Sequence, residues 1–69
     1  MDLDALYEVM ITDSMIQVWS PDFSGNDDGI IFEGNIRRSY KTVEPYMYNR
    51  VFQIEVDEQG KLYVGIEMK

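Results

Sequence analysis

The chain of 69 residues contains no cysteine and no histidine. A disulfide needs cysteine, and both residue types are common zinc ligands and supply the usual proton carrier and thiol nucleophile of enzymes. Domains below about 70 to 80 residues often depend on disulfides or a metal, so this chain has to depend on packing, helped by a partner or a second copy. We therefore expect no enzyme activity, no catalytic residues, no metal site and no cofactor.

Lysine and arginine are absent from residues 1–36, which hold eight of the thirteen acidic residues. Residues 37–69 hold all six bases and the other five acids, so the net charge of -7 resides almost wholly in the first half. A surface of one sign repels nucleic acid and anionic membranes and attracts basic grooves. The charge predicts a protein partner with a basic groove, and no direct contact with nucleic acid or membrane.

The sequence also lacks long apolar segments, and no basic residue directly follows Met1. No apolar segment approaches the roughly 20 residues of a membrane span. Met1 is followed by acidic residues rather than by the basic segment that opens a secretory signal. We expect a cytoplasmic protein, and the length predicts a single domain over residues 1–69.

The N-terminal segment has apolar residues at helical spacing. It predicts an amphipathic helix over residues 3–12, capped by Asp2 or Asp4, with these residues on its apolar face: Leu3, Leu6, Tyr7, Met10 and Ile11. Alternation of apolar and polar residues from Tyr7 onward leaves a strand as the alternative.

Two hairpins are expected after this helix. Residues 15–20 and 30–37 are rich in strand formers and flank a loop of turn-forming residues, several of them acidic. Residues 51–57 and 61–67 alternate apolar and polar side chains, which predicts the second hairpin. Together these elements predict an α+β domain in which the N-terminal helix packs on a four-stranded antiparallel sheet.

The register of the second hairpin follows from its hydrophobic pattern. A three-residue loop, Glu58-Gln59-Gly60, keeps the apolar sets of both strands on one face and places Gly60 in the left-handed conformation. The register then predicts five pairs: Val56 with Leu62, Ile54 with Val64, Phe52 with Ile66, Glu55 with Tyr63, and Asp57 with Lys61.

Carboxylates are the main candidates for contact with a partner. At alternate strand positions they stand about 6.6 Å apart, close to the spacing of phosphates along a nucleic-acid strand. Trp19 and Phe23 near the first loop would supply apolar anchors. An acidic surface that only keeps the domain soluble is the alternative. The predicted acidic contacts form two groups: Asp22, Asp27, Asp28 and Glu33, and then Glu55, Asp57 and Glu58.

In size, charge and layout the chain resembles the small acidic proteins of bacteriophages and mobile elements, anti-CRISPR proteins among them. The resemblance covers the helix, the hairpin from Ile16 to Gly34 and the hairpin from Val51 to Glu67. Several anti-CRISPR proteins fill the channel with which a Cas effector reads nucleic acid. The resemblance implies a phage-type inhibitor that occupies the basic groove of a host defence nuclease by acidic mimicry, in the bacterial cytosol.

A small homodimeric interaction or assembly module is the alternative function. Tyr40, Tyr46, Met47 and Tyr48 lie between the two hairpins and could form an exposed aromatic patch for the contact. An open edge of the predicted sheet offers a second way to pair two copies.

Overall fold

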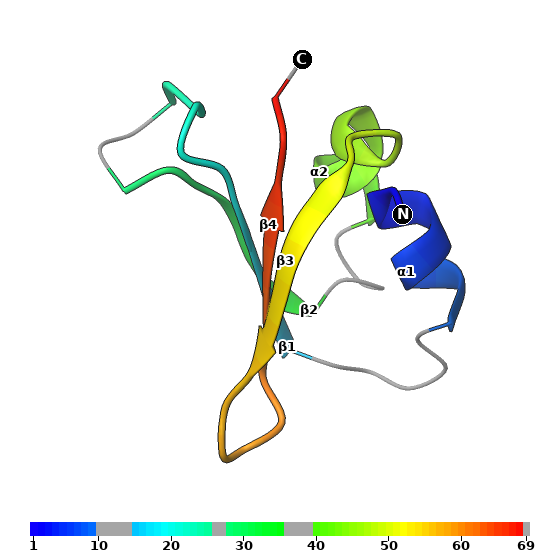
Figure 1. The fold of residues 1–69 in the computed structure, drawn as a ribbon, viewed down its shortest axis with the longest axis vertical. Coiled ribbons are helices and arrows are strands. Elements are labelled where there is room, and N and C mark those ends of the chain that lie inside the picture. Colours follow the sequence, from blue (N-terminus) through cyan, green and yellow to red (C-terminus); the bar gives the residue numbers. More distant parts are fainter. Residues whose placement is uncertain (10–14, 26–27, 36–39, 69) are drawn as a thin grey trace.

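The computed structural model describes residues 1–9, 15–25, 28–35 and 40–68. These residues form an α+β fold with one four-stranded sheet and short helical segments (Figure 1). In chain order the elements are α1 (Leu3–Val9), β1 (Met15–Trp19), β2 (Ile30–Asn35), α2 (Tyr40–Val43), the 3-10 helix η1 (Glu44–Tyr46), β3 (Val51–Val56) and β4 (Leu62–Ile66). No helix in these described ranges is long and apolar enough to cross a membrane.

The N-terminal segment is a helix rather than a strand. Asp2 caps it, because its Oδ1 accepts a hydrogen bond from the backbone N–H of Ala5 at 2.9 Å. Leu3 and Leu6 are buried on the same side of α1, as the helical spacing predicts. The last predicted residues of this helix, 10–12, lie outside the described ranges.

The sheet is mixed, and the prediction of a wholly antiparallel sheet is wrong in one pair. The strand order is β2-β1-β4-β3, and both hairpins are antiparallel, but β1 and β4 run parallel. Turn chemistry fixes pairing only within a hairpin. Pairing between the hairpins follows from burial, since the two central strands carry the fully buried side chains of the sheet: Ile16, Val18, Val64 and Ile66.

The predicted register of the second hairpin is confirmed near its turn, where Gly60 has φ +86°. Three predicted pairs are present in the strands: Val56 with Leu62, Ile54 with Val64, and Glu55 with Tyr63. In the turn, Asp57 N donates to Lys61 O at 3.0 Å, as their predicted pairing requires. The predicted pair of Phe52 with Ile66 is wrong, because Ile66 pairs with Val51 and Phe52 is an extra residue in a bulge. The bulge lets Val51 enter the core while the ring of Phe52 meets Trp19 on the opposite face of the sheet.

The helical segments lie on one side of the sheet (Figure 1). Backbone hydrogen bonds tie the start of α1 to the segment before β3, from Leu3 N to Asn49 O at 3.1 Å and from Asp4 N to Met47 O at 2.7 Å. The single predicted helical cover is thus replaced by three short segments that share one core. That core comprises Leu3, Leu6, Ile16, Val18, Val43, Met47, Val51, Val64 and Ile66.

Candidate partner-binding surface

The face of the sheet opposite the core, here called the helix-free face, gathers aromatic side chains from separate strands. Trp19 on β1 lies opposite Gly65 on β4. The rings of Trp19 and Phe52 meet edge to face, with centroids 5.4 Å apart and an interplanar angle of 81°. Because Trp19 is half-buried and Phe52 is exposed, the two rings form an apolar patch that still contacts solvent.

Gly65 makes the room for these rings. A Cβ at this position would lie 2.8 Å from Cζ2 of Trp19 and 2.9 Å from Cζ of Phe52, closer than real Cβ contacts. The glycine therefore allows both rings to approach β4 closely, and a larger residue would push them away from the sheet.

A polar row crosses the same face next to the rings. In the observed register Glu33 lies opposite Gln17, Gln17 opposite Tyr63, and Tyr63 opposite Glu55. The row therefore spans all four strands, with a carboxylate at each outer end. At about 4.8 Å per strand these two positions stand about 14 Å apart.

Lys61 binds one of these carboxylates. Its Nζ pairs with Oε2 of Glu33, which also accepts a hydrogen bond from Nε2 of Gln17 at 3.4 Å. The hydrogen bond from Lys61 is the main cause that lowers the pKa of Glu33, and the same bond raises the pKa of Lys61. The Lys61 ammonium also lies 5.2 Å from the ring centroid of Tyr63, so it offsets part of the negative charge of this face.

Asp57 has a structural task in the β3–β4 turn. Its Oδ1 accepts hydrogen bonds from the backbone N–H of Lys61 and of Gln59, each at 2.9 Å, and its Oδ2 accepts one from the Tyr63 hydroxyl at 3.2 Å. The bond from Lys61 N–H is the main cause that lowers the pKa of Asp57. Asp57 thus stays ionised at neutral pH, and Glu58 beside it in the turn is exposed.

The loop carboxylates lie at the other end of the sheet. Asp22 and Asp28 are exposed in the β1–β2 loop, whereas Asp27 lies outside the described residues. Because β1 is parallel to β4, this loop and the β3–β4 turn are at opposite ends of the sheet. The structure therefore separates Glu33 from the loop acids with which the sequence grouped it, and places it in one row with Glu55.

Phe23 in the same loop belongs to the helical side. Its ring meets Tyr46 of η1 edge to face, with centroids 6.4 Å apart. The buried Ser20 holds the start of the loop, since its Oγ accepts a hydrogen bond from Asp22 N at 3.3 Å. Phe23 and Trp19 are therefore not anchors of one surface.

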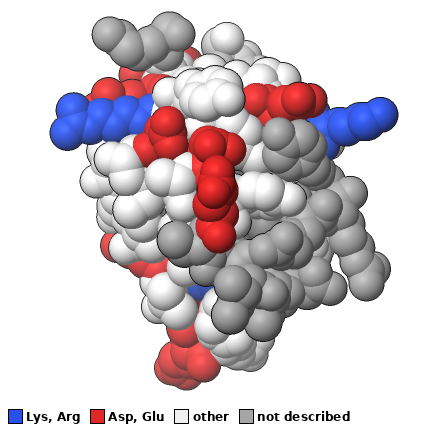
Figure 2. Space-filling model, turned by 90° about the vertical axis from the view of Figure 1, so that its right-hand side faces the viewer, with Lys and Arg blue, Asp and Glu red and all other residues white. Residues whose placement is uncertain are grey.

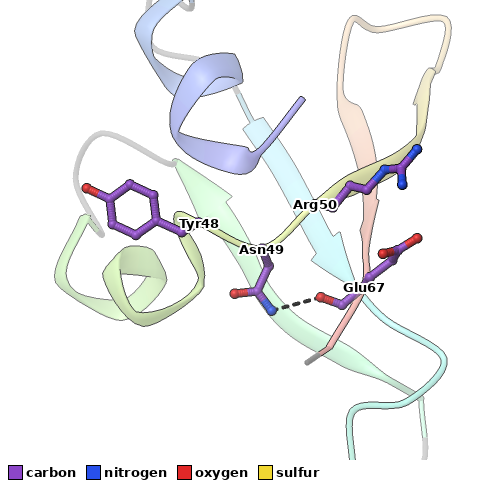
Figure 3. A pocket seen from close by; sticks show the side chains of 4 residues that line it. All are labelled: Tyr48, Asn49, Arg50 and Glu67. Atoms are coloured by element: carbon purple, nitrogen blue, oxygen red, sulfur yellow. Dashed lines mark hydrogen bonds between the residues drawn. The ribbon is translucent and has the colours of Figure 1, made fainter.

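The predicted aromatic patch between the hairpins is not formed as expected. Met47 is only 2% exposed and belongs to the core, so it cannot contact a partner in this conformation. Tyr46 is half-buried against Phe23, and Tyr48 is 83% exposed. Tyr48 lines a shallow hollow together with Asn49, Arg50 and Glu67, in which Nδ2 of Asn49 donates to the Glu67 carbonyl at 2.8 Å (Figure 3).

Negative charge is also present on the side of the helices. Figure 2 shows Asp and Glu side chains in the upper part of that side and again at its lower end, with Lys or Arg at the two upper flanks. The exposed acids of this region include Glu8 on α1 and Glu44 on η1. What distinguishes the helix-free face is therefore the polar row across all four strands, with a carboxylate at each end, beside the Trp19–Phe52 ring pair.

Sequence reasoning did not select Phe52, Tyr63 and Gln17 for this surface. Tyr63 could have been predicted as a contact residue, because the predicted register already placed it opposite Glu55 on the solvent side. Phe52 could not be found, since the bulge that moves it across the sheet has no signal in the hydrophobic pattern. Among the described residues no group of three or more Asp or Glu side chains could hold a metal ion.

Comparison of the chain with protein-family models, with curated proteins and with solved structures finds no match.

Proposed function

We propose that this protein is a non-enzymatic inhibitor that occupies a basic, nucleic-acid-binding groove of another protein, and that the helix-free face makes the contact. The observation that carries the proposal is the juxtaposition of the Trp19–Phe52 ring pair with the row that ends in Glu33 and Glu55. Interfaces of this kind use a few aromatic anchors for affinity and surrounding charges for orientation and rate.

The geometry of the carboxylates suits a groove lined by Lys and Arg. Glu55 lies near the end of β3 and Asp57 directly follows that strand, so an extended backbone sets them about 6.6 Å apart, close to the phosphate spacing of a nucleic-acid strand. Glu58 continues the acidic edge into the turn. The low pKa of Asp57 keeps it charged, and the net charge of -7 draws a basic surface toward the whole molecule.

The target class is inferred from size, charge and layout. A small acidic chain of the phage type favours a nuclease of a bacterial defence system, such as a Cas effector, as the owner of the groove. The site of action would then be the bacterial cytosol. The loop acids Asp22 and Asp28 would form a second, separate contact at the far end of the sheet, and Asp27 remains a contact residue predicted from the sequence alone.

Affinity capture with DNA competition tests this function. The immobilised protein is exposed to bacterial lysate that contains candidate defence nucleases, and bound proteins are released by a salt gradient and identified by mass spectrometry. We expect a basic nuclease that elutes at moderate salt and is displaced by duplex DNA. A partner that resists salt and ignores DNA would contradict acidic mimicry.

A further inference from the structure

The outer edge of β3 is covered at its start and open beyond it. β3 is the last strand of the sheet, and among the described residues only Met1 and Asp2 pair with its outer side. Val51 N donates to Met1 O at 2.8 Å, and Asp2 forms an antiparallel bridge with Arg50. The chain then turns away into α1, so the edge from residue 52 to residue 56 stays exposed.

The direction of the backbone groups along this edge follows from the hairpin register. Asp57 N donates to Lys61 O at 3.0 Å, and Glu55 lies opposite Tyr63 two residues further along. Antiparallel pairs alternate between hydrogen-bonded and non-hydrogen-bonded positions. Glu55 therefore directs its N–H and C=O toward β4, whereas Ile54 and Val56 direct theirs outward, where a further strand could bind them.

Beyond the bulge at Phe52, this edge has only one charged side chain, Glu55, to hinder pairing. Natural edge strands are usually protected by Pro, by Lys or by a cover, and β3 contains neither of these residues. Its apolar side chains are open to solvent, with Ile54 40% and Val56 61% exposed. The strand thus offers both free backbone groups and apolar surface.

We propose that β3 pairs antiparallel with β3 of a second copy of the chain, about a two-fold axis that passes beside Ile54, to form a continuous eight-stranded sheet. In this register Ile54 lies opposite Ile54 of the partner subunit, and the two exchange both backbone hydrogen bonds. Gln53 lies opposite Glu55 of the partner subunit, and an amide opposite a carboxylate is a favourable cross-strand pair. Within one chain Gln53 already donates to Glu55 at 2.8 Å, which shows that the two groups match.

Neighbouring registers are less favourable. A shift by two residues in one direction sets Glu55 opposite Glu55 of the partner subunit, and like charges in direct opposition destabilise a sheet. The shift in the other direction sets Val51 opposite Glu55 of the partner subunit, where Met1 already occupies the outer side of the strand, since Val51 N donates to Met1 O. The self-complementary register at Ile54 is therefore the one that the free part of the edge allows.

The dimer goes beyond the proposed inhibitor function and does not depend on it. A two-fold axis perpendicular to the sheet places the helix-free faces of both copies on the same side. Each chain carries a net charge of -7, so added salt should strengthen the dimer by screening repulsion, whereas it should weaken binding to a basic groove. The two proposals can therefore fail independently.

Disulfide trapping tests the register, because the chain has no cysteine of its own. The variant Ile54→Cys should be trapped as a dimer by mild oxidation with diamide, since its Cα atoms would lie about 5.5 Å apart, within the range of disulfides. In the variant Glu55→Cys the corresponding atoms would lie about 8 Å apart. That variant, and Tyr48→Cys at an exposed position elsewhere, should remain monomeric on a non-reducing gel. Equal trapping at all three positions, or none at Ile54, would overturn the proposal.

A proline variant tests the backbone pairing independently. Light scattering of the unaltered chain at rising concentration should approach twice the chain mass of 8.1 kDa. Ile54→Pro removes an outward N–H and should leave the hairpin and its circular dichroism intact. It should weaken the dimer by between about tenfold and about a hundredfold, since both inter-chain hydrogen bonds are lost. A mass of 8.1 kDa at every concentration would overturn the proposal and leave the edge to a strand of another protein.

Discussion

Lys61, the last residue of the turn before β4, reaches past the intervening strand β1 to bind Glu33 on β2. The contact ties the second hairpin to the first on the helix-free face, where Gln17 of β1 also donates to the same carboxylate oxygen. Glu33 thus links β2 to β1 and to the β3–β4 turn. The same ion pair holds one of the proposed contact carboxylates in place and reduces the net charge of its surroundings.

Removing the Lys61 ammonium should lower the melting temperature only slightly. Lys61→Met keeps much of the side-chain volume and deletes the charge, and partly exposed ion pairs contribute little because water and salt screen them. Thermal unfolding of Lys61→Met, Glu33→Gln and the double variant measures the coupling between the two residues. The coupling should disappear at high salt. A loss that persists there would mean that the lysine stem stabilises by packing over Tyr63.

Stability should fall as the pH drops below the ordinary carboxyl values, 4.5 for Glu and 3.8 for Asp. Hydrogen bonds from Lys61 lower the folded-state pKa of both Glu33 and Asp57, so folding favours their ionised forms. This contribution is present above the unfolded-state pKa and is lost as the pH falls through the folded-state pKa.

The contribution of Lys61 to stability has the opposite pH dependence. The pKa of Lys61 is raised above 10.5, so its contribution is complete below that pH and is lost as the pH rises through the folded-state value.

Melting temperatures between pH 2 and neutral pH should show the loss of stability in acid, and Asp57→Asn should make that loss shallower. An unchanged acid profile in this variant would exclude Asp57 as a contributor.

Replacing Gly60 should have a purely backbone cost. Its φ is +86°, and a Cβ built there meets nothing within 4 Å. Gly60→Ala should therefore destabilise the fold by about 1 to 2 kcal/mol, the cost of the left-handed conformation for a residue with a Cβ. Gly60→Asn should cost less, because Asn tolerates this conformation. Urea unfolding measures both, and equal stability of the Ala variant would show that the turn can change its conformation.

Replacing Gly65 should act on the aromatic rings instead. The new methyl group of Gly65→Ala would overlap Trp19 and Phe52, and overpacking typically costs about 1 to 3 kcal/mol. Trp19 is the only tryptophan, so its fluorescence reports directly on the displaced ring. The double variant Gly65→Ala, Phe52→Ala should regain part of the stability. A normal emission spectrum in the single variant would contradict the packing described here.

Local sequence patterns predicted the parts of the fold that depend on local interactions. The Asp2 cap, the turn at Gly60 and the pairing of Ile54 with Val64 all follow from residues close in sequence, and all are present. The parallel pair of β1 and β4 depends on which apolar strands reach the centre of the sheet, and no turn encodes that choice.

The candidate surface also combines residues that the sequence identifies with an arrangement that only the strand order determines. The sequence identified Trp19, Glu33 and Glu55 as contact residues, but it grouped Trp19 and Glu33 with the first loop and assigned Glu55 to a second acidic edge. Only the order of the four strands brings them to one face. The burial of Met47 was equally hidden, because a methionine between two tyrosines suits an exposed patch as well as a core.

Two double variants with equal charge separate a specific acidic contact from diffuse attraction. Glu55→Gln with Glu58→Gln removes two charges at the second hairpin, and Glu8→Gln with Glu44→Gln removes two exposed charges on the side of the helices. Asp2 is unsuitable as a control, because it caps α1. Each double variant changes the net charge from -7 to -5, so long-range attraction to a basic partner is the same.

For binding to the captured nuclease, we expect the first double variant to lose at least about tenfold more affinity than the second, because carboxylates in a contact lose direct hydrogen bonds as well as attraction. Titration at two salt concentrations measures both terms, and duplex DNA should displace the control variant as it displaces the unaltered chain. Equal losses in the two double variants would mean that the helix-free face is not the contact. The acidic residues would then act only through the charge of the whole molecule, as a solubilising surface does.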